Sequence, residues 1–138
     1  MNTEIRQRIE AADRAIREER FDDLMSFYTD DAVLVVRPGL LARGKAEIRR
    51  AFERIAAYFR NSVAPTQGEM YMIEAGDTVL VLSQTLLDAD NRDEVDVSMD
   101  RRATYVYRRM NCEWLCAVDN SYGTELLGQA IENGGEKS

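Results

Sequence analysis

The sequence predicts a single α+β domain, with helices in its first half and an antiparallel sheet in its second. Apolar residues recur at helical spacing through much of the first half of the chain, and from Gly68 onward they alternate with the period of two that strands show. Because the helical and strand patterns are segregated, alternating βαβ units are excluded. A length of 138 residues fits one domain, which we place at residues 1–131, with 132–138 as a polar, disordered tail.

Three helices are expected in the first half of the chain. The first has an apolar stripe that begins at Ile5 and recurs at Ile9 and Ile16, with charged residues between them. A second, short helix is predicted over Phe21–Tyr28, and a third over Lys45–Phe59. The narrow apolar stripe of the first helix indicates a helix that covers a sheet on one side.

The strands are expected in two groups. A β-rich run is followed by a Pro–Gly turn and a short return strand, and then, after a loop over Asn61–Gln67, four strands follow one another as a meander. The predicted strands are Ala32–Val36, Leu40–Ala42, Glu69–Glu74, Thr78–Leu87, Val95–Arg109 and Glu113–Asn120.

The composition excludes several classes of function. A net charge of −7 without a concentrated basic face argues against nucleic acids and anionic membranes as partners. No apolar run approaches the roughly 20 residues of a membrane span, and no signal peptide is visible, so a cytoplasmic location is expected. The two cysteines are expected to be reduced thiols. With no histidine in the chain, histidine-based catalysis is excluded and no metal site is expected.

Several segments resemble one known family. They are Phe21–Ala32, Arg43–Ile48, Tyr105–Arg109 and Trp114–Thr124, in the order and at the spacing found in the nuclear transport factor 2-like superfamily, in its SnoaL-like and ketosteroid isomerase-like branch. The resemblance implies a cone-shaped, cystatin-like fold in which three N-terminal helices pack on a curved antiparallel or mixed sheet. It also implies a pocket inside the cone and a homodimer formed through the sheet. No cofactor is expected.

The residues that carry steroid isomerisation in this family are not kept. By the resemblance, the tyrosine of the first helix falls on Ala12, the catalytic base on Val36 or Arg37, and the oxyanion aspartate near Ala103. An arginine cannot act as a general base at neutral pH, because its pKa exceeds about 12. Branches of the superfamily that use a His–Asp pair are excluded by the absence of histidine.

Asp119 is the candidate catalytic residue. It lies near the end of the last strand, at a position that faces the pocket in related folds, and a carboxylate there is suited to acid–base work. The alternative is an aspartate that orders the strand end by accepting bonds from backbone amides. Ala117 and Ser121 are expected beside it on the pocket wall.

Four aromatic residues are expected to line the pocket. By the resemblance, Tyr105 and Tyr107 share the inward face of one strand, and core or dimer-interface packing is their alternative role. Tyr28 and Phe52 are expected on helices over the pocket mouth, with core packing as the alternative. Arg102 is a possible polar partner of the catalytic carboxylate, and a surface ion pair is its alternative role.

Three residues of the last strand are assigned to a dimer interface. Trp114 lies five residues before Asp119, so on a regular strand the two face opposite sides of the sheet. Cys116 and Val118 share the parity of Trp114 and complete an apolar stripe on the outer face.

Three functions remain open. The first is a homodimeric domain that binds a small apolar organic molecule. The second is a cofactor-independent isomerase, cyclase or dehydratase with Asp119 as acid–base group. The third is an interaction module whose function is dimerisation.

Overall fold

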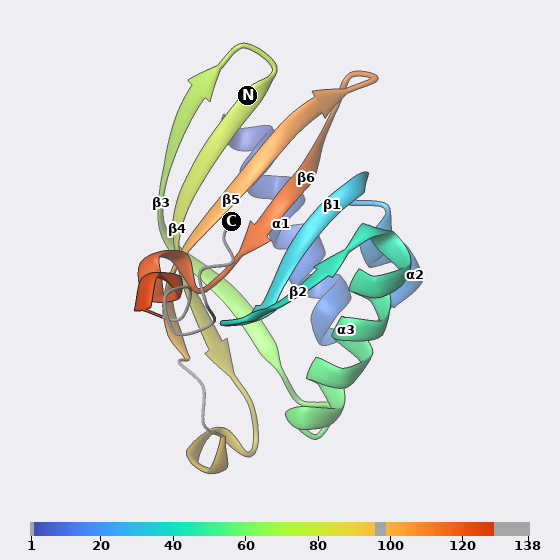
Figure 1. Ribbon diagram of the computed structural model, residues 1–138, viewed down its shortest axis with the longest axis vertical. Helices are drawn as coiled ribbons and strands as arrows, with labels where there is room; N and C mark the ends of the chain where they lie inside the picture. The colour runs from blue at the N-terminus through green and yellow to red at the C-terminus, as the bar shows by residue number, and fades with distance from the viewer. Residues whose placement is uncertain (1, 96–98, 129–138) are drawn as a thin grey trace.

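The computed structural model describes residues 2–95 and 99–128 (Figure 1). Its helices and strands follow the expected order along the chain. They are α1 (Asn2–Arg17), α2 (Phe21–Met25), β1 (Tyr28–Arg37), β2 (Leu40–Arg43), α3 (Gly44–Tyr58), β3 (Ala64–Ala75), β4 (Thr78–Asp88), β5 (Asp100–Met110) and β6 (Glu113–Asn120), with 3-10 turns at Arg92–Glu94 and Gly123–Glu125.

The strands form one mixed sheet in the order β2-β1-β6-β5-β4-β3. Neighbouring strands are antiparallel except β1 and β6, which run parallel because α3 and the β3–β5 meander intervene between them. Figure 1 shows the twisted sheet with α1 behind it and with α2 and α3 beside β1 and β2. The predicted α+β class, with helices packed on a curved sheet, is confirmed.

The core lies between the helices and the inner face of the sheet. Helix α1 packs mainly on β3, and α3 packs on β1 and β2. Ile5 of α1, Ile48 of α3, and Val79 and Val81 of β4 are all fully buried. Val79 and Val81 share the inner face of the sheet because alternate residues of a strand point to the same side. Burial of side chains of this size stabilises the fold by roughly 1.5–3 kcal/mol each.

Several predicted boundaries are wrong. The strand predicted to begin at Val95 begins at Asp100. The second helix ends at Met25 instead of Tyr28, because the Cys116 amide of β6 donates to the Phe27 carbonyl (2.8 Å) and draws this backbone into the sheet. Tyr28 is therefore the first residue of β1. Pro65, placed in a loop from the sequence, lies in β3. This strand is at the edge of the sheet, where a residue without an N–H is tolerated.

The outer face of the sheet keeps large apolar side chains exposed. Tyr71 and Ile73 of β3 are 67% and 48% exposed, and Leu82 of β4, the strand partner of Tyr71, is 38% exposed. These three residues, here called the outer apolar patch, point away from the helices.

The predicted tail at 132–138 lies outside the described residues, so the expectation of disorder there stays a prediction. Within the described part of the chain, no helix is both long enough and apolar enough to span a bilayer.

Candidate functional site

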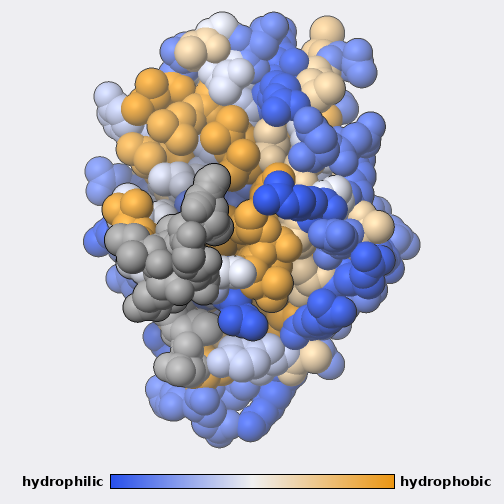
Figure 2. Space-filling view, viewed as in Figure 1, coloured by the Kyte–Doolittle hydropathy of each residue, from blue (hydrophilic) through white to orange (hydrophobic). Residues whose placement is uncertain are grey.

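A cavity of about 600 Å³ lies between the helices and the inner face of the sheet. Most of its wall is apolar, and Figure 2 shows hydrophobic residues gathered near the centre of the view. Many of the apolar side chains come from α1, β1 and α3, among them Ile9, Ile16, Leu34, Val36, Phe52 and Ile55.

Asp119 faces this cavity with Tyr28 as its hydrogen-bond partner. The two residues come from adjacent parallel strands, and the Tyr28 hydroxyl donates to Asp119 Oδ2 at 2.6 Å. Tyr28 is buried, and its ring lies 6.4 Å from that of Phe52. The arrangement differs from the expected alternative, in which Asp119 would have been bonded by backbone amides.

Opposing effects set the charge of Asp119. Burial raises the pKa of its carboxyl, whereas the hydrogen bond from Tyr28 and the positive charge of Arg101 act to lower it. Burial also holds the pKa of Tyr28 well above its ordinary value, and the charge of Asp119 adds to that effect. Tyr28 therefore stays protonated and donates its hydrogen bond throughout the neutral range.

Asp13 is a second carboxyl group on the same cavity wall, and it was not predicted from the sequence. It lies four residues after Ile9 on α1, which places it on the buried face of the helix, and it is only 7% exposed. Burial raises its pKa to about 7, with a further contribution from the charge of Asp119, while a hydrogen bond from Gln67 lowers it. Its position on the apolar stripe of α1 was the sequence feature from which this buried acid could have been predicted.

A chain of polar side chains holds Asp13 in place. The amide oxygen of Gln67 accepts bonds from the hydroxyls of Ser83 (2.6 Å) and Thr85 (3.0 Å), so its Nε2 donates to Asp13 Oδ2 (3.0 Å). Thr85 in turn contacts the Tyr105 hydroxyl at 2.7 Å. This chain links a carboxyl on α1 to a tyrosine on β5 across the inner face of the sheet.

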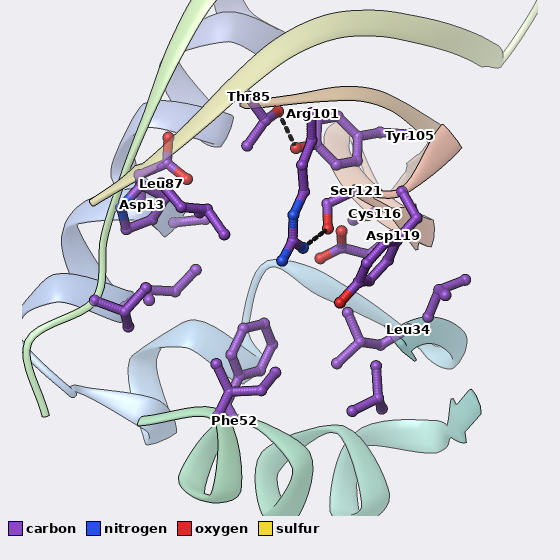
Figure 3. A pocket seen from close by; sticks show the side chains of 18 of the residues that line it. Asp13, Leu34, Phe52, Thr85, Leu87, Arg101, Tyr105, Cys116, Asp119 and Ser121 are labelled. Carbon is purple, nitrogen blue, oxygen red and sulfur yellow. Dashed lines mark hydrogen bonds between the residues drawn. The ribbon is translucent and has the colours of Figure 1, made fainter. Parts of the chain in front are cut away.

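Arg101, not the expected Arg102, is the buried arginine of the cavity. Arg101 is 6% exposed, its Nη1 donates to Ser121 Oγ at 2.6 Å, and its guanidinium lies 4.2 Å from the centre of the Tyr122 ring. In Figure 3 it extends from β5 between the side carrying Asp13 and the side carrying Asp119. Arg102 is exposed on the opposite face of the strand.

A β-bulge explains why the residues of β6 do not face as expected. The pairing with β5 shifts between Val106 and Tyr107, which pair with Val118 and Cys116, so Ala117 is an extra residue in the strand. The bulge reverses the parity of the strand residues after it. Ala117 is buried but is not one of the residues that line the cavity.

The interface assignment is corrected for two of its three residues. Trp114 is buried within a single chain and belongs to the main core, and Cys116 lines the cavity. Only Val118 lies on the outer face with partial exposure. Burial raises the pKa of the Cys116 thiol well above its ordinary value, so this thiol stays protonated.

The other residues that were expected to line the pocket do line the cavity. Tyr28, Phe52, Tyr105, Tyr107 and Ser121 all line it, although Tyr28 does so from a strand. The positions that correspond to isomerase residues also reach the wall, at Ala12, Val36 and Arg37, whereas Ala103 is buried in the core. Among the described residues, no three His, Cys, Asp or Glu side chains gather to hold a metal ion.

Comparison with known proteins identifies the fold and a family. Residues 5–117 match the family model of a SnoaL-like domain. Among solved structures, Aln2 from a Streptomyces species is similar with a TM-score of 0.75, 15% identity and 94% of each chain covered.

Two further structures support the same fold. A protein from Catenulispora acidiphila in complex with S-DNPA has a TM-score of 0.71 and 20% identity over 86% of this chain and 89% of that chain. An NTF2-like protein with a cystatin-like fold from Novosphingobium aromaticivorans has a TM-score of 0.68 and 18% identity over 86% and 78%. The cystatin-like fold implied by the resemblance is thereby confirmed. No curated protein matches the chain.

Proposed function

The chain belongs to the SnoaL-like domain family, and we propose that it binds a small, largely apolar organic molecule in its cavity and transfers a proton on it. A volume of about 600 Å³ is typical of small-molecule sites. The observation that carries the proposal is the pair of carboxyl groups, Asp13 and Asp119, whose pKa values are both raised and which line one apolar cavity.

The two carboxyl groups are suited to different roles. Asp119 has a hydrogen-bond donor in Tyr28 and a cation in Arg101 that stabilise its charged form, so it is the better proton acceptor. Asp13, with a pKa of about 7, keeps a proton in a large share of molecules near neutral pH and is the better donor.

This pair supports reactions that remove a proton from carbon and return one elsewhere. Asp119 takes a proton from a carbon next to a carbonyl group, and the electrons of the C–H bond move toward the carbonyl oxygen. Asp13 in its acid form supplies a proton to that oxygen or to another atom of the product. Isomerisation, cyclisation and dehydration each combine these two steps, so we propose a cofactor-independent enzyme of this kind.

The proposal is not steroid isomerisation by the known arrangement. Two positions that hold catalytic groups in those enzymes correspond here to Ala12 and Ala103, and the base corresponds to Val36 or Arg37. The carboxyl groups of this cavity come from other positions, one of them the neighbour of Ala12. The proton-transfer geometry therefore differs from that of the isomerases.

We also propose that the protein is a homodimer through the outer face of the sheet. The outer apolar patch supports this assembly, because Tyr71, Ile73 and Leu82 form a contiguous exposed surface on two paired strands. Val118 lies on the same face of the sheet.

Kemp elimination of 5-nitrobenzisoxazole tests the proton-transfer proposal without knowledge of the natural substrate. A carboxylate removes the ring C–H proton, the N–O bond breaks, and a coloured cyanonitrophenolate forms. We expect Asp119→Asn to lower the protein-dependent rate by at least about 100-fold. Asp77→Asn, an exposed change in a turn, serves as the control and should leave it unchanged. Equal rates for the wild type and Asp119→Asn would refute the role given to Asp119.

A further inference from the structure

Two arginines stand at the solvent side of the cavity wall. Arg37 comes from the end of β1 and Arg54 from α3, and both are exposed while also lining the cavity. Leu40 and Tyr58, 41% and 48% exposed, line the cavity beside them. These four residues are here called the mouth.

Within the part of the chain that the structure describes, no acid neutralises the two arginines. Neither forms an ion pair with another residue in 2–95 or 99–128, although many other basic residues of this part of the chain do. On α3 the residues four before and four after Arg54 are Arg50 and Tyr58, so no acid lies at that helical spacing.

The mouth carries positive charge, although the protein as a whole has a negative net charge. The chain has a net charge of −7, yet among the described residues the charged ones that line the cavity are Asp13, Arg37, Arg54, Arg101 and Asp119. Both acids are buried or partly buried with raised pKa values, and the two exposed members are cations. A molecule approaching the cavity therefore meets positive charge first and apolar surface next.

From this arrangement we infer that the natural ligand is an amphipathic organic acid, bound with its apolar body in the cavity and its anionic group at the mouth between Arg37 and Arg54. This inference rests on the proposed small-molecule function and names the class of ligand. Guanidinium groups bind carboxylates and similar oxyanions through paired, charge-assisted hydrogen bonds. The two arginines would repel a cationic ligand, and a neutral ligand would form no charge-assisted hydrogen bond with them.

Two fluorescent probes of nearly the same shape separate the anionic contribution from the apolar one. N-phenyl-1-naphthylamine is neutral, and 1-anilinonaphthalene-8-sulfonate is the same aromatic body with an added sulfonate. We expect both probes to bind, and the sulfonate to bind at least about tenfold more tightly at low salt. Its advantage should shrink as salt rises, because the mouth is exposed to solvent.

The variants assign that advantage to the mouth. The double variant R37Q/R54Q should lose about tenfold in affinity for the sulfonate and keep its affinity for the neutral probe. Arg50→Gln removes an exposed charge of α3 that does not line the cavity, and should change neither affinity. Leu82→Glu alters the outer apolar patch and should also change neither.

The outcomes distinguish this inference from the function on which it rests. If the neutral probe binds but the sulfonate gains nothing over it, or if Arg50→Gln costs as much as the double variant, the anionic ligand class is refuted and the apolar pocket stands. If neither probe binds, or if Leu82→Glu abolishes binding of both, the pocket function fails and the inference fails with it.

Discussion

Asp13 is a residue whose charge the fold controls strongly. Its carboxyl is enclosed by α1 and the inner face of the sheet, and its bonded partner Gln67 is itself fixed by two hydroxyl groups. Such a group is costly to ionise, because burial penalises the charged form more than one neutral donor compensates. The cost should appear in the stability of the whole protein.

We expect Asp13 to make the fold less stable as pH rises. Its pKa is 3.8 in the reference state and about 7 in the fold, so between these values the folded state holds a proton that the unfolded state has lost. Stability from this group is complete below the lower value and lost on passing the higher one, a change of about 4 kcal/mol. Asp13→Asn removes this pH-dependent contribution. In chemical denaturation, the free energy of unfolding of the variant should therefore rise relative to that of the wild type between about pH 4 and about pH 8.

The matched control for this titration is Asp77→Asn, which changes an exposed carboxyl. Its unfolding free energy should follow that of the wild type across the same pH range. A constant difference between Asp13→Asn and the wild type at every pH would show that Asp13 has an ordinary pKa.

The residues of the site were predictable only in part. Asp119 and Tyr105 follow from the resemblance, because both lie in segments that carry it. Arg101 was missed although it lies four residues before Tyr105 and so shares its face of the strand. The hydrogen bonds of Gln67 could not be predicted from the sequence, because they join residues of α1, β3 and β4 that come together only in the tertiary fold.

At the scale of elements, the bulge in β6 decides which side chains reach the cavity. It lets Trp114 and Cys116 face the helices before Ala117, and Asp119 face them after it. A regular strand cannot place Trp114 and Asp119 on one face, because they are five residues apart. Nothing local in the sequence marks the extra residue, so the parity argument assigned Trp114 and Cys116 to the wrong side.

The segment after β6 is a second element that shapes the cavity, and Gly123 fixes its path. The residue has φ +58°, and a Cβ there would lie 1.9 Å from the Arg102 carbonyl oxygen. We expect Gly123→Ala to cost at least about 3 kcal/mol of unfolding free energy, since both strain and a backbone clash oppose it. The close approach also holds Tyr122 against Arg101, so the change should reach the cavity.

Gly76 gives the matched measurement for the strain alone. It has φ +62°, but a Cβ there would meet nothing within 4 Å. Gly76→Ala should therefore cost only about 1–2 kcal/mol in the same urea titration. Equal costs at the two glycines would show that the segment after β6 does not pack on β5 as described.

At the scale of the whole molecule, the outer apolar patch predicts assembly. We expect light scattering to give the mass of two chains for the wild type and of one chain for Leu82→Glu, because a buried unpaired carboxylate disfavours the interface. Leu41→Glu is the control, since Leu41 is 42% exposed on β2, at the opposite edge of the sheet from β3. A single-chain mass for the wild type would contradict the dimer.

The fold as a whole was the most predictable level. Segregated helical and strand periods gave its class, and the resemblance gave the curved mixed sheet, because both depend on patterns spread over many residues. The parallel pairing of β1 with β6 depends on contacts between Tyr28 and Cys116 and between Leu34 and Asp119, far apart in the chain. The same pairing brings Tyr28 to Asp119, so the site is a product of the complete topology.

The central claim is that one apolar cavity holds two carboxyl groups whose pKa values the fold has raised. The most direct measurement is a pH titration of the carboxyl carbons by NMR, with signals assigned through Asp13→Asn and Asp119→Asn. We predict that Asp13 titrates near pH 7, that Asp119 titrates above the ordinary value of 3.8, and that both signals move when N-phenyl-1-naphthylamine is added. Titration of both carboxyl groups together with the exposed carboxylates, and no response of either to the probe, would contradict the claim.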